Sequence, residues 1–259
     1  VLFYYWAKPE HTYEWSIFVN DHIAEIQNKY KNKFIGLGTL PMQDVNLAIK
    51  ELERCANVLN LAGIEIGTHI ESRNLDDPYY FPFYQKAEEL GMTLFVHPWD
   101  MMGQEKMPNY FLPWLVGMPA ETSLAISSMI FGGVFDKFPK LKVLFAHGGG
   151  CFPQTLGRIN HAWHVRPDLC NVNNIKEPKE YIGKFYVDSL VHDPDTLKFL
   201  VNLFGAEKIA LGTDFPFPLG DLEYGAEIEN HKELSQEQKD QILYKTAMEI
   251  FNLEIDQHK

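Results

Sequence analysis

The chain has 259 residues, 46% of them hydrophobic, and a formal net charge of -12 at pH 7. This length suits one large α/β domain, and the negative charge disfavours nucleic acid as a partner, because phosphate binding needs clustered Lys and Arg. Charges break every apolar window before the roughly 18 residues that a membrane span needs, so we expect a soluble globular protein. The three cysteines, Cys55, Cys151 and Cys170, lack C-x-x-C spacing and fit a reducing cytosol.

Apolar runs rich in Val, Ile and Phe alternate with helical patterns along the chain. The first run, residues 1–6, has no initiator Met and no charged signal-peptide flank, so we expect that the chain starts part-way through a longer protein. Strands are predicted at residues 34–40, 63–68, 93–98, 142–147, 185–189 and 208–214. Most are too uniformly apolar for a sheet with one wet face, which predicts βαβ units around a parallel sheet.

Helices are predicted between these strands. They cover residues 12–31, 45–59, 80–90, 120–135, 153–164, 194–204 and 235–251. Two of the starts carry capping signals. Ser235 with Gln238 three residues later resembles a capping box, and Asp195 lies beside Pro194 at another start.

Six strands are two fewer than a closed (β/α)₈ barrel requires, and each βαβ unit takes roughly 30 residues. We therefore predict a single α/β domain over residues 1–259, a TIM barrel from which the first one or two strand units are absent. An open doubly wound sheet is the alternative fold. It usually carries a glycine-rich first βα turn, and no such turn occurs before Gly148.

Three of the predicted strands end on a side chain that can hold a metal: His97, His147 and Asp214. The carboxyl ends of parallel strands line the open face where barrel enzymes do their chemistry. Each residue alone has a structural explanation, as a core histidine or a turn aspartate. Two histidines and one aspartate at three strand ends, however, indicate a catalytic metal site.

The His147 strand runs into three glycines, Gly148, Gly149 and Gly150, before a predicted helix. Glycines allow close backbone approach to a ligand, and a helix amino terminus favours anions, so a phosphate-binding loop is a rival interpretation. The segment lacks the Lys-Ser/Thr pair that a P-loop requires.

The chain has four arginines, Arg54, Arg73, Arg158 and Arg166, and the last two follow the His147 strand. Eight helical residues advance about 12 Å, so these two need not contact the same group. Arginine forks match carboxylates, which favours an anionic carboxylate substrate. A solvated helix face explains the spacing equally well.

Four segments carry a resemblance to a known family: HPWD at residues 97–100, LPWLVGMPAET at 112–122, HGGG at 147–150 and GTDFPFP at 212–218. In these segments the chain resembles the 2-amino-3-carboxymuconate 6-semialdehyde decarboxylase family of the amidohydrolase superfamily. The resemblance runs from about Phe3 to Leu253. It implies a barrel of the metal-dependent hydrolase type.

The resemblance also implies a zinc-dependent decarboxylation, with His97 and Asp214 as zinc ligands and His147 as general base. Such ligands suit other divalent metals too. Zinc lowers the pKa of a water to about 7, and the family is thought to add the resulting hydroxide to the conjugated substrate before carbon dioxide leaves. The implied product is 2-aminomuconate 6-semialdehyde. In kynurenine-pathway tryptophan catabolism, this decarboxylation would limit the formation of quinolinate and NAD.

Further residues of the resemblance concern the substrate. Arg158 matches an arginine that reaches into the neighbouring subunit's site to hold a substrate carboxylate, which implies a homodimer. Arg166 lies in the same matched stretch, where the resemblance implies a supporting role in substrate binding. Trp114 matches an aromatic side chain of the substrate pocket. At Phe111 relatives often have Trp, so the pocket wall is expected to differ slightly.

The family's remaining zinc ligands, a His-x-His pair on the first barrel strand, have no counterpart in the 259 residues. A catalytic zinc usually has three protein ligands and a water. We therefore expect this chain to bind zinc poorly and to be nearly inactive, in contrast to a longer form. Two alternatives stay open: a hydrolase of the same superfamily, or an inactive truncated chain without a complete metal site.

Overall fold

A computed structural model of the protein describes residues 3–31 and 33–253, and the six predicted strands form one sheet in it. In sheet order they are β1 Leu37–Gly38, β2 Gly63–Gly67, β5 Thr93–His97, β6 Val143–Phe145, β7 Tyr186–Asp188 and β8 Ile209–Ala210. Every neighbouring pair is parallel, which confirms the predicted parallel sheet. The strands β1 and β8 are shorter than predicted, because each is an edge strand with one neighbour.

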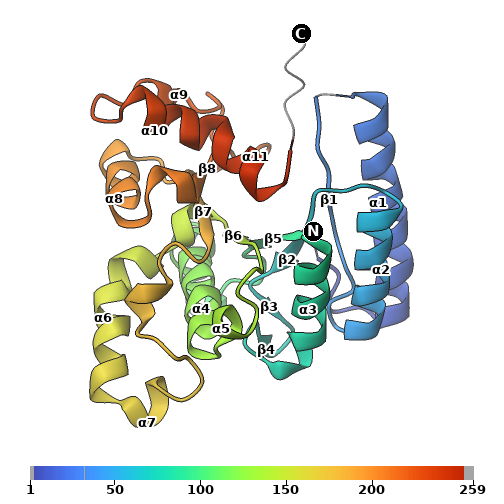
Figure 1. Cartoon of the computed structure of the whole chain (residues 1–259), viewed down its shortest axis with the longest axis horizontal. Coiled ribbons are helices and arrows are strands. Elements are labelled where there is room, and N and C mark those ends of the chain that lie inside the picture. Colours follow the sequence, from blue (N-terminus) through green and yellow to red (C-terminus); the bar gives the residue numbers. More distant parts are fainter. Residues whose placement is uncertain (1–2, 32, 254–259) are drawn as a thin grey trace.

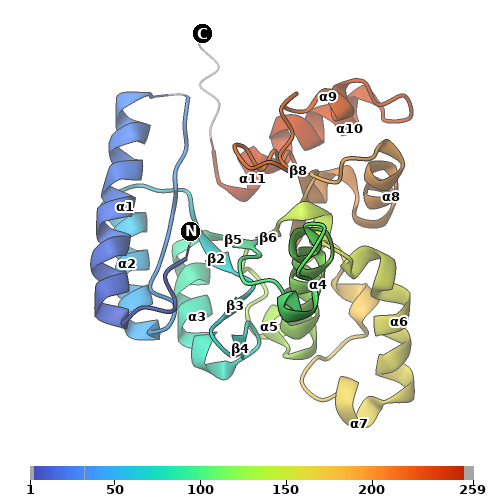
Figure 2. The same cartoon turned by 180° about the vertical axis from the view of Figure 1, so that it is seen from behind.

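The helices follow one another around the outside of the sheet in chain order (Figures 1 and 2). They are α1 Pro9–Lys29, α2 Val45–Asn57, α3 Phe81–Leu90, α4 Met118–Phe131, α5 Val134–Lys137, α6 Phe152–Val165, α7 Pro167–Cys170, α8 Pro194–Phe204, α9 Ala226–Glu229, α10 Gln236–Asp240 and α11 Thr246–Ile250. Each of the seven predicted helical segments is present, although two of them are interrupted. Gly133, at φ 69°, separates α4 from α5, and a π-helical turn over Gln241–Lys245 separates α10 from α11.

The structure confirms one predicted helix cap, corrects another and adds a small hairpin that was not predicted. The capping box of Ser235 and Gln238 is confirmed. The cap of α8 is Asp193 rather than Asp195, because only the Asp193 carboxylate accepts the amide of Thr196. A small antiparallel hairpin, β3 His69–Ile70 with β4 Arg73–Asn74, was not predicted, since strands of two residues carry no periodic signal.

The side chains of each strand alternate between the two faces of the sheet. On β5, Leu94 and Val96 face the helices and belong to the main core. Phe95 faces the inside of the curved sheet with Leu144 and Tyr186, where a smaller apolar cluster forms. The same alternation brings the last residue of β5, the metal candidate, to the inner face.

The parallel order, with one helical crossover between successive strands, is the architecture of a (β/α)₈ barrel in six of its eight strands, as predicted. Among residues 3–31 and 33–253, β1 and β8 do not pair with each other. Figure 1 shows the blue β1 and the red α11 on the two sides of this opening. In the same described residues, no helix combines the length and the apolar composition that crossing a membrane requires.

The apolar run at residues 1–6 falls partly within the structure. Val1 and Leu2 lie outside the described residues, whereas Phe3 and Tyr5 are buried. The Tyr5 ring packs edge-on against Trp99 at 5.4 Å between centroids, and the Gly67 amide donates to the Tyr5 hydroxyl at 3.1 Å. This segment therefore reaches the carboxyl ends of β2 and β5, which the sequence pattern did not predict.

Candidate metal centre

The structure brings His97, His147 and Asp214 together at the carboxyl ends of β5, β6 and β8. The Nε2 atom of His97 lies 3.4 Å from one carboxylate oxygen of Asp214, and Nε2 of His147 lies 3.7 Å from the other. Each of the three offers one ligand atom, and these atoms all lie within 4.8 Å of one another. Among the described residues, no other group of three His, Cys, Asp or Glu side chains meets this condition.

The chemistry of the donors fits a divalent cation. The Nδ1 atom of His97 lies 2.9 Å from the carbonyl oxygen of Pro98, so this nitrogen carries the hydrogen and leaves Nε2 free towards Asp214. Two imidazole nitrogens and a carboxylate are the donors that zinc, iron and manganese share. These residues therefore fit a catalytic metal, and the same donors suit zinc, iron and manganese.

The electrostatics of the cluster follow from its partial burial. Burial alone would raise the pKa of Asp214, but hydrogen bonds from His147 and His97 hold it well below its usual range. Burial alone would lower the pKa of His97, but its hydrogen bond to Asp214 and the charges of Glu65 and Asp214 raise it. Without a cation, His97 and Asp214 therefore stabilise each other's charged forms.

The loop after β6 has an unusual backbone. His147, at φ 56°, and Gly148, Gly149 and Gly150 all have positive φ. A Cβ atom on Gly150 would lie 2.3 Å from the carbonyl oxygen of Pro119, at the start of α4. The glycines are therefore explained by packing against protein atoms, so the rival phosphate-loop interpretation is not needed.

Three cavities open from the metal candidates. One, of about 280 Å³, lies among aromatic and thioether side chains that include Trp99, Trp114 and Met118, and His97 and Asp214 line it too. A second, of about 480 Å³, lies inside the curved sheet and is lined by all three cluster residues. A third, of about 330 Å³, is lined by His147, Asp214 and Trp114. Trp114, the predicted pocket aromatic, thus borders the first cavity, where its ring stacks on that of Phe111 at 4.4 Å.

The two arginines singled out from the sequence lie away from these cavities in one copy of the chain. Arg166 is exposed and forms a two-point ion pair with Asp168, at 2.9 and 2.7 Å. Arg158 is exposed on α6, and within residues 3–31 and 33–253 its side chain forms no hydrogen bond or ion pair. Neither lines a cavity that the metal candidates share.

Two carboxylate side chains near the cluster were not predicted as site residues from the sequence. Glu65, on β2, lines the inner cavity. Burial raises the pKa of Glu65 above its usual range, although the charge of His97 acts in the opposite direction. Asp188 ends β7 and lines the same cavity. Asp188 follows the same strand-end rule that identified His97, so that rule was sufficient to find it, whereas the inward direction of Glu65 depends on the register of β2.

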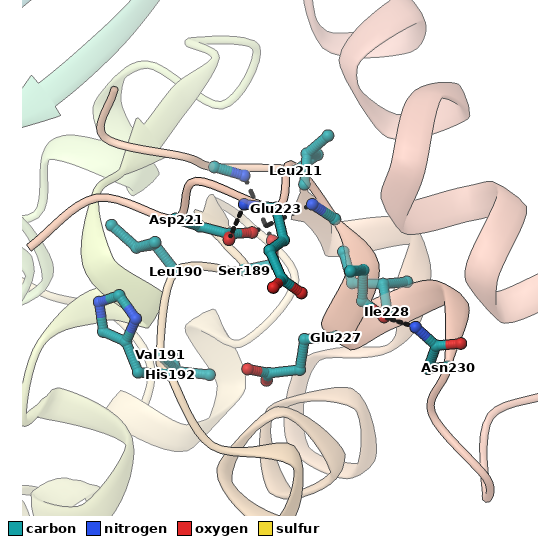
Figure 3. Close-up of a pocket in the computed structure, with 13 residues that line it drawn as sticks. Ser189, Leu190, Val191, His192, Leu211, Asp221, Glu223, Glu227, Ile228 and Asn230 are labelled. Atoms are coloured by element: carbon teal, nitrogen blue, oxygen red, sulfur yellow. Dashed lines mark hydrogen bonds between the residues drawn. The ribbon is translucent and has the colours of Figure 1, made fainter. Parts of the chain in front are cut away.

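A further cavity of about 340 Å³ adjoins the cluster (Figure 3), walled in part by Ser189, His192, Asp221 and Glu227. Two of its polar side chains, Asp221 and Ser189, hold the loops that form it. The Asp221 carboxylate accepts the amides of Glu223 and Gly225 at 2.8 and 3.0 Å, and the Ser189 hydroxyl accepts the Gly212 amide at 3.2 Å. This cavity is a neighbour of the metal candidates, and none of the three lines it.

Comparisons with known proteins agree with this geometry. A family model described as "Amidohydrolase" matches residues 9–253. The chain is 56% identical, over 254 residues, to 2-amino-3-carboxymuconate-6-semialdehyde decarboxylase of Dictyostelium discoideum. The match covers 98% of this chain and 71% of that protein.

Two solved structures that are similar to the chain are named as decarboxylases. The 5-carboxyvanillate decarboxylase of Sphingomonas paucimobilis has a TM-score of 0.88 at 26% identity, and the match covers 96% of this chain and 75% of that one. A dihydroxybenzoic acid decarboxylase from Polaromonas sp. JS666 has a TM-score of 0.84 at 25% identity, covering 95% and 77%. The latter structure holds manganese and the inhibitor 2-nitroresorcinol.

Proposed function

The chain belongs to the amidohydrolase family, and from this premise we propose that it is a metal-dependent decarboxylase of 2-amino-3-carboxymuconate 6-semialdehyde. The observation that carries the proposal is the cluster of His97, His147 and Asp214, of which His97 and Asp214 line a cavity with aromatic walls. The 56% identity over nearly the whole chain supports this substrate over those of the more distant decarboxylases. We also propose that residues 1–259 form one domain of this family.

His97 and Asp214 are proposed to hold the cation. Both side chains are largely buried, and the carboxylate of Asp214 is ionised because its pKa lies below the usual range. When bound, the divalent cation supplies the positive charge that makes a neighbouring water acidic and polarises the substrate. We propose zinc, while the manganese in a structural neighbour supports only a divalent cation in general.

His147 is proposed as the general base. Its Nε2 faces the oxygen of Asp214 at 3.7 Å, so a proton accepted there yields an imidazolium beside a carboxylate. His147 also lines a cavity of about 330 Å³ shared with Trp114 and Asp214, where a substrate can reach it. A proton held at this atom is available for return to the substrate carbon after carbon dioxide has left.

The substrate carries two carboxylates, and arginines supply their proposed contacts. Arg158 is exposed on α6 and lines none of the cavities that the metal candidates share, which supports the proposal that it serves a second copy of the chain. The active unit would then be a homodimer. Arg166 already has Asp168 as partner, which supports a role in placing the end of α6 rather than direct contact with the substrate.

We further propose a cytosolic place in tryptophan catabolism, where this decarboxylation competes with closure of the substrate to quinolinate. Cys55, Cys151 and Cys170 are free thiols, which supports a reducing compartment.

Carbon dioxide release from 2-amino-3-carboxymuconate 6-semialdehyde tests the function, and it is measured on the metal-loaded protein in a form that also carries the His-x-His pair expected from the family resemblance. 5-Carboxyvanillate serves as the comparison substrate, since a structural neighbour is named for it. The proposal predicts turnover of 2-amino-3-carboxymuconate 6-semialdehyde and little or none of the aromatic acid. Turnover of only the aromatic acid, or of neither, contradicts the proposed substrate.

A further inference from the structure

Asp188 occupies a central place at the metal centre that its position in the sequence did not reveal. It is the last residue of β7, and β7 lies between β6 and β8 in the sheet. Its side chain faces the inner cavity that His97, His147 and Asp214 also line, and the residue is only 5% exposed. A carboxylate here is buried between the strand that leads to His147 and the strand that leads to Asp214.

Asp188 contacts the loops on both sides of it. Its Oδ1 atom accepts the amide of Gly148 at 2.9 Å and that of Leu190 at 3.1 Å. Gly148 directly follows His147. On the other side, a Cβ atom at Gly212 would lie 2.7 Å from Oδ2, so Gly212 has no side chain because the carboxylate fills that space.

The loop that Asp188 holds is in a conformation that needs outside support. His147 has φ 56°, in the left-handed region that residues with a side chain seldom adopt, and three glycines with positive φ follow it. The amides of Gly149 and Gly150 bond to carbonyls at the start of the same loop. Among the described residues, only the Gly148 amide of these three glycines bonds to another strand, through Asp188.

The contacts of Asp188 are hydrogen bonds rather than an ion pair. Within residues 3–31 and 33–253, no Lys, Arg or His lies within ion-pair distance of its carboxylate. Backbone amides therefore supply the favourable contacts that a buried carboxylate requires. Asp188 therefore acts as a hydrogen-bond acceptor, and the side-chain amide oxygen of an asparagine at this position could accept the same two bonds.

We propose that Asp188 is a positioning residue that fixes the His147 loop, and through it the direction of the His147 ring towards Asp214. This inference rests on the proposed function in assigning the proton transfer to His147. Displacement of a catalytic group by about 1 Å can cost about 100-fold in rate, so a released loop should be measurable in turnover.

The experiment compares Asp188→Ala, which removes the acceptor, with Asp188→Asn, which removes the charge and keeps an acceptor oxygen. Asp136→Ala is the matched control, because the Asp136 carboxylate accepts the amide of Ile175 and the hydroxyl of Tyr181 away from the cavities. Amide hydrogen exchange at residues 146–151 and 187–191 is measured without substrate. kcat and KM are measured on the metal-loaded protein.

For Asp188→Ala we expect exchange in both segments to be about tenfold faster or more, kcat to fall by about 100-fold and KM to change by less than about threefold. Asp188→Asn should retain most of the protection and most of kcat, and Asp136→Ala should leave both unchanged. An Asn variant as impaired as the Ala variant would overturn the inference in favour of a charge effect. Unchanged exchange in Asp188→Ala would overturn it as well.

The two kinds of measurement separate this inference from the proposed function. Hydrogen exchange needs no substrate, so it tests the hold on the loop even if the protein releases no carbon dioxide. An active protein whose Asp188→Ala variant keeps full kcat would contradict the positioning role and leave the proposed function intact.

Discussion

His147 has two possible uses at the residue scale, as general base or as third ligand, and one substitution separates them. If it is the base, His147→Gln should lower kcat by about 100-fold to 10,000-fold and leave the metal content at the wild-type level, because His97 and Asp214 remain. His97→Gln should lose the metal. Elemental analysis and carbon dioxide release measure the two effects, and His161→Gln, on the exposed face of α6, is the control. Loss of metal from His147→Gln would assign it as a ligand instead.

Metal affinity should fall as the pH is lowered. In the metal-free protein the pKa of His97 is raised above its usual range, because Asp214 and Glu65 favour the imidazolium over the opposing effect of burial. A cation binds only the neutral ring, so below this raised pKa the apparent affinity should drop by about tenfold per pH unit.

A chelator-competed metal titration between pH 5.5 and 8.5 measures this dependence. Glu65→Gln removes one of the charges that raise the pKa of His97, so it should move the decline to lower pH. Affinity that stays constant over the whole range would show that proton competition at His97 is absent.

The strand-end rule explains which site residues could be predicted from the sequence. His97, His147 and Asp214 each follow an apolar strand, and parallel strands bring such residues to one face, where the structure places them. Trp99 borders the same cavity because the segment at Phe3 and Tyr5 packs against it. That contact joins residues far apart in the chain, and no local pattern encodes it.

At the element scale, the helical unit after β8 depends on its first residue. The Ser235 hydroxyl accepts the amide of Gln238, and the Gln238 side chain accepts the amide of Ser235. The π-helical turn that follows is tied to the sheet, because the Leu211 amide donates to the carbonyl of Ile242 at 2.9 Å. Loss of the cap should therefore weaken an element that supports β8.

Ser235→Ala should lower the free energy of unfolding by about 1 kcal/mol, and Ser235→Asp, which keeps a capping oxygen, should restore most of it. Urea unfolding of the three proteins measures the difference. Equal stability of the wild type and Ser235→Ala would mean that the capping box contributes nothing in solution.

The elements differ in how well their limits could be predicted. Apolar periodicity located all six strands, and the prediction for α8 agrees with Pro194–Phe204. The predicted helix at 120–135 ends earlier, because Gly132 and Gly133 interrupt it, and the helix at 235–251 contains a π-helical turn. Such interruptions depend on packing against the sheet, which the periodicity of one helix does not contain.

At the scale of the whole molecule, the parallel sheet and its helical crossovers were predictable because successive βαβ units repeat one pattern along the chain. Contacts between copies are different, since no repeat or spacing reports them. Arg158 is exposed on α6 and lines none of the cavities at the metal candidates of its own chain, so its proposed role needs a second copy.

Mixing two inactive variants tests that role. Arg158→Ala leaves the chain's own His147 intact, and His147→Gln leaves its Arg158 free to serve the other subunit. A mixed dimer would then contain one site with both residues present. After denaturation and refolding of an equal mixture, about half of the dimers are mixed, so we expect about a quarter of wild-type carbon dioxide release.

The unmixed variants refolded separately are the control, and each should remain nearly inactive. If Arg158 acted within its own chain, every site in the mixture would lack either the arginine or the base, and refolding would restore nothing. Recovery in this experiment therefore requires both a dimer and a site shared between its subunits, because no single chain in the mixture carries both residues.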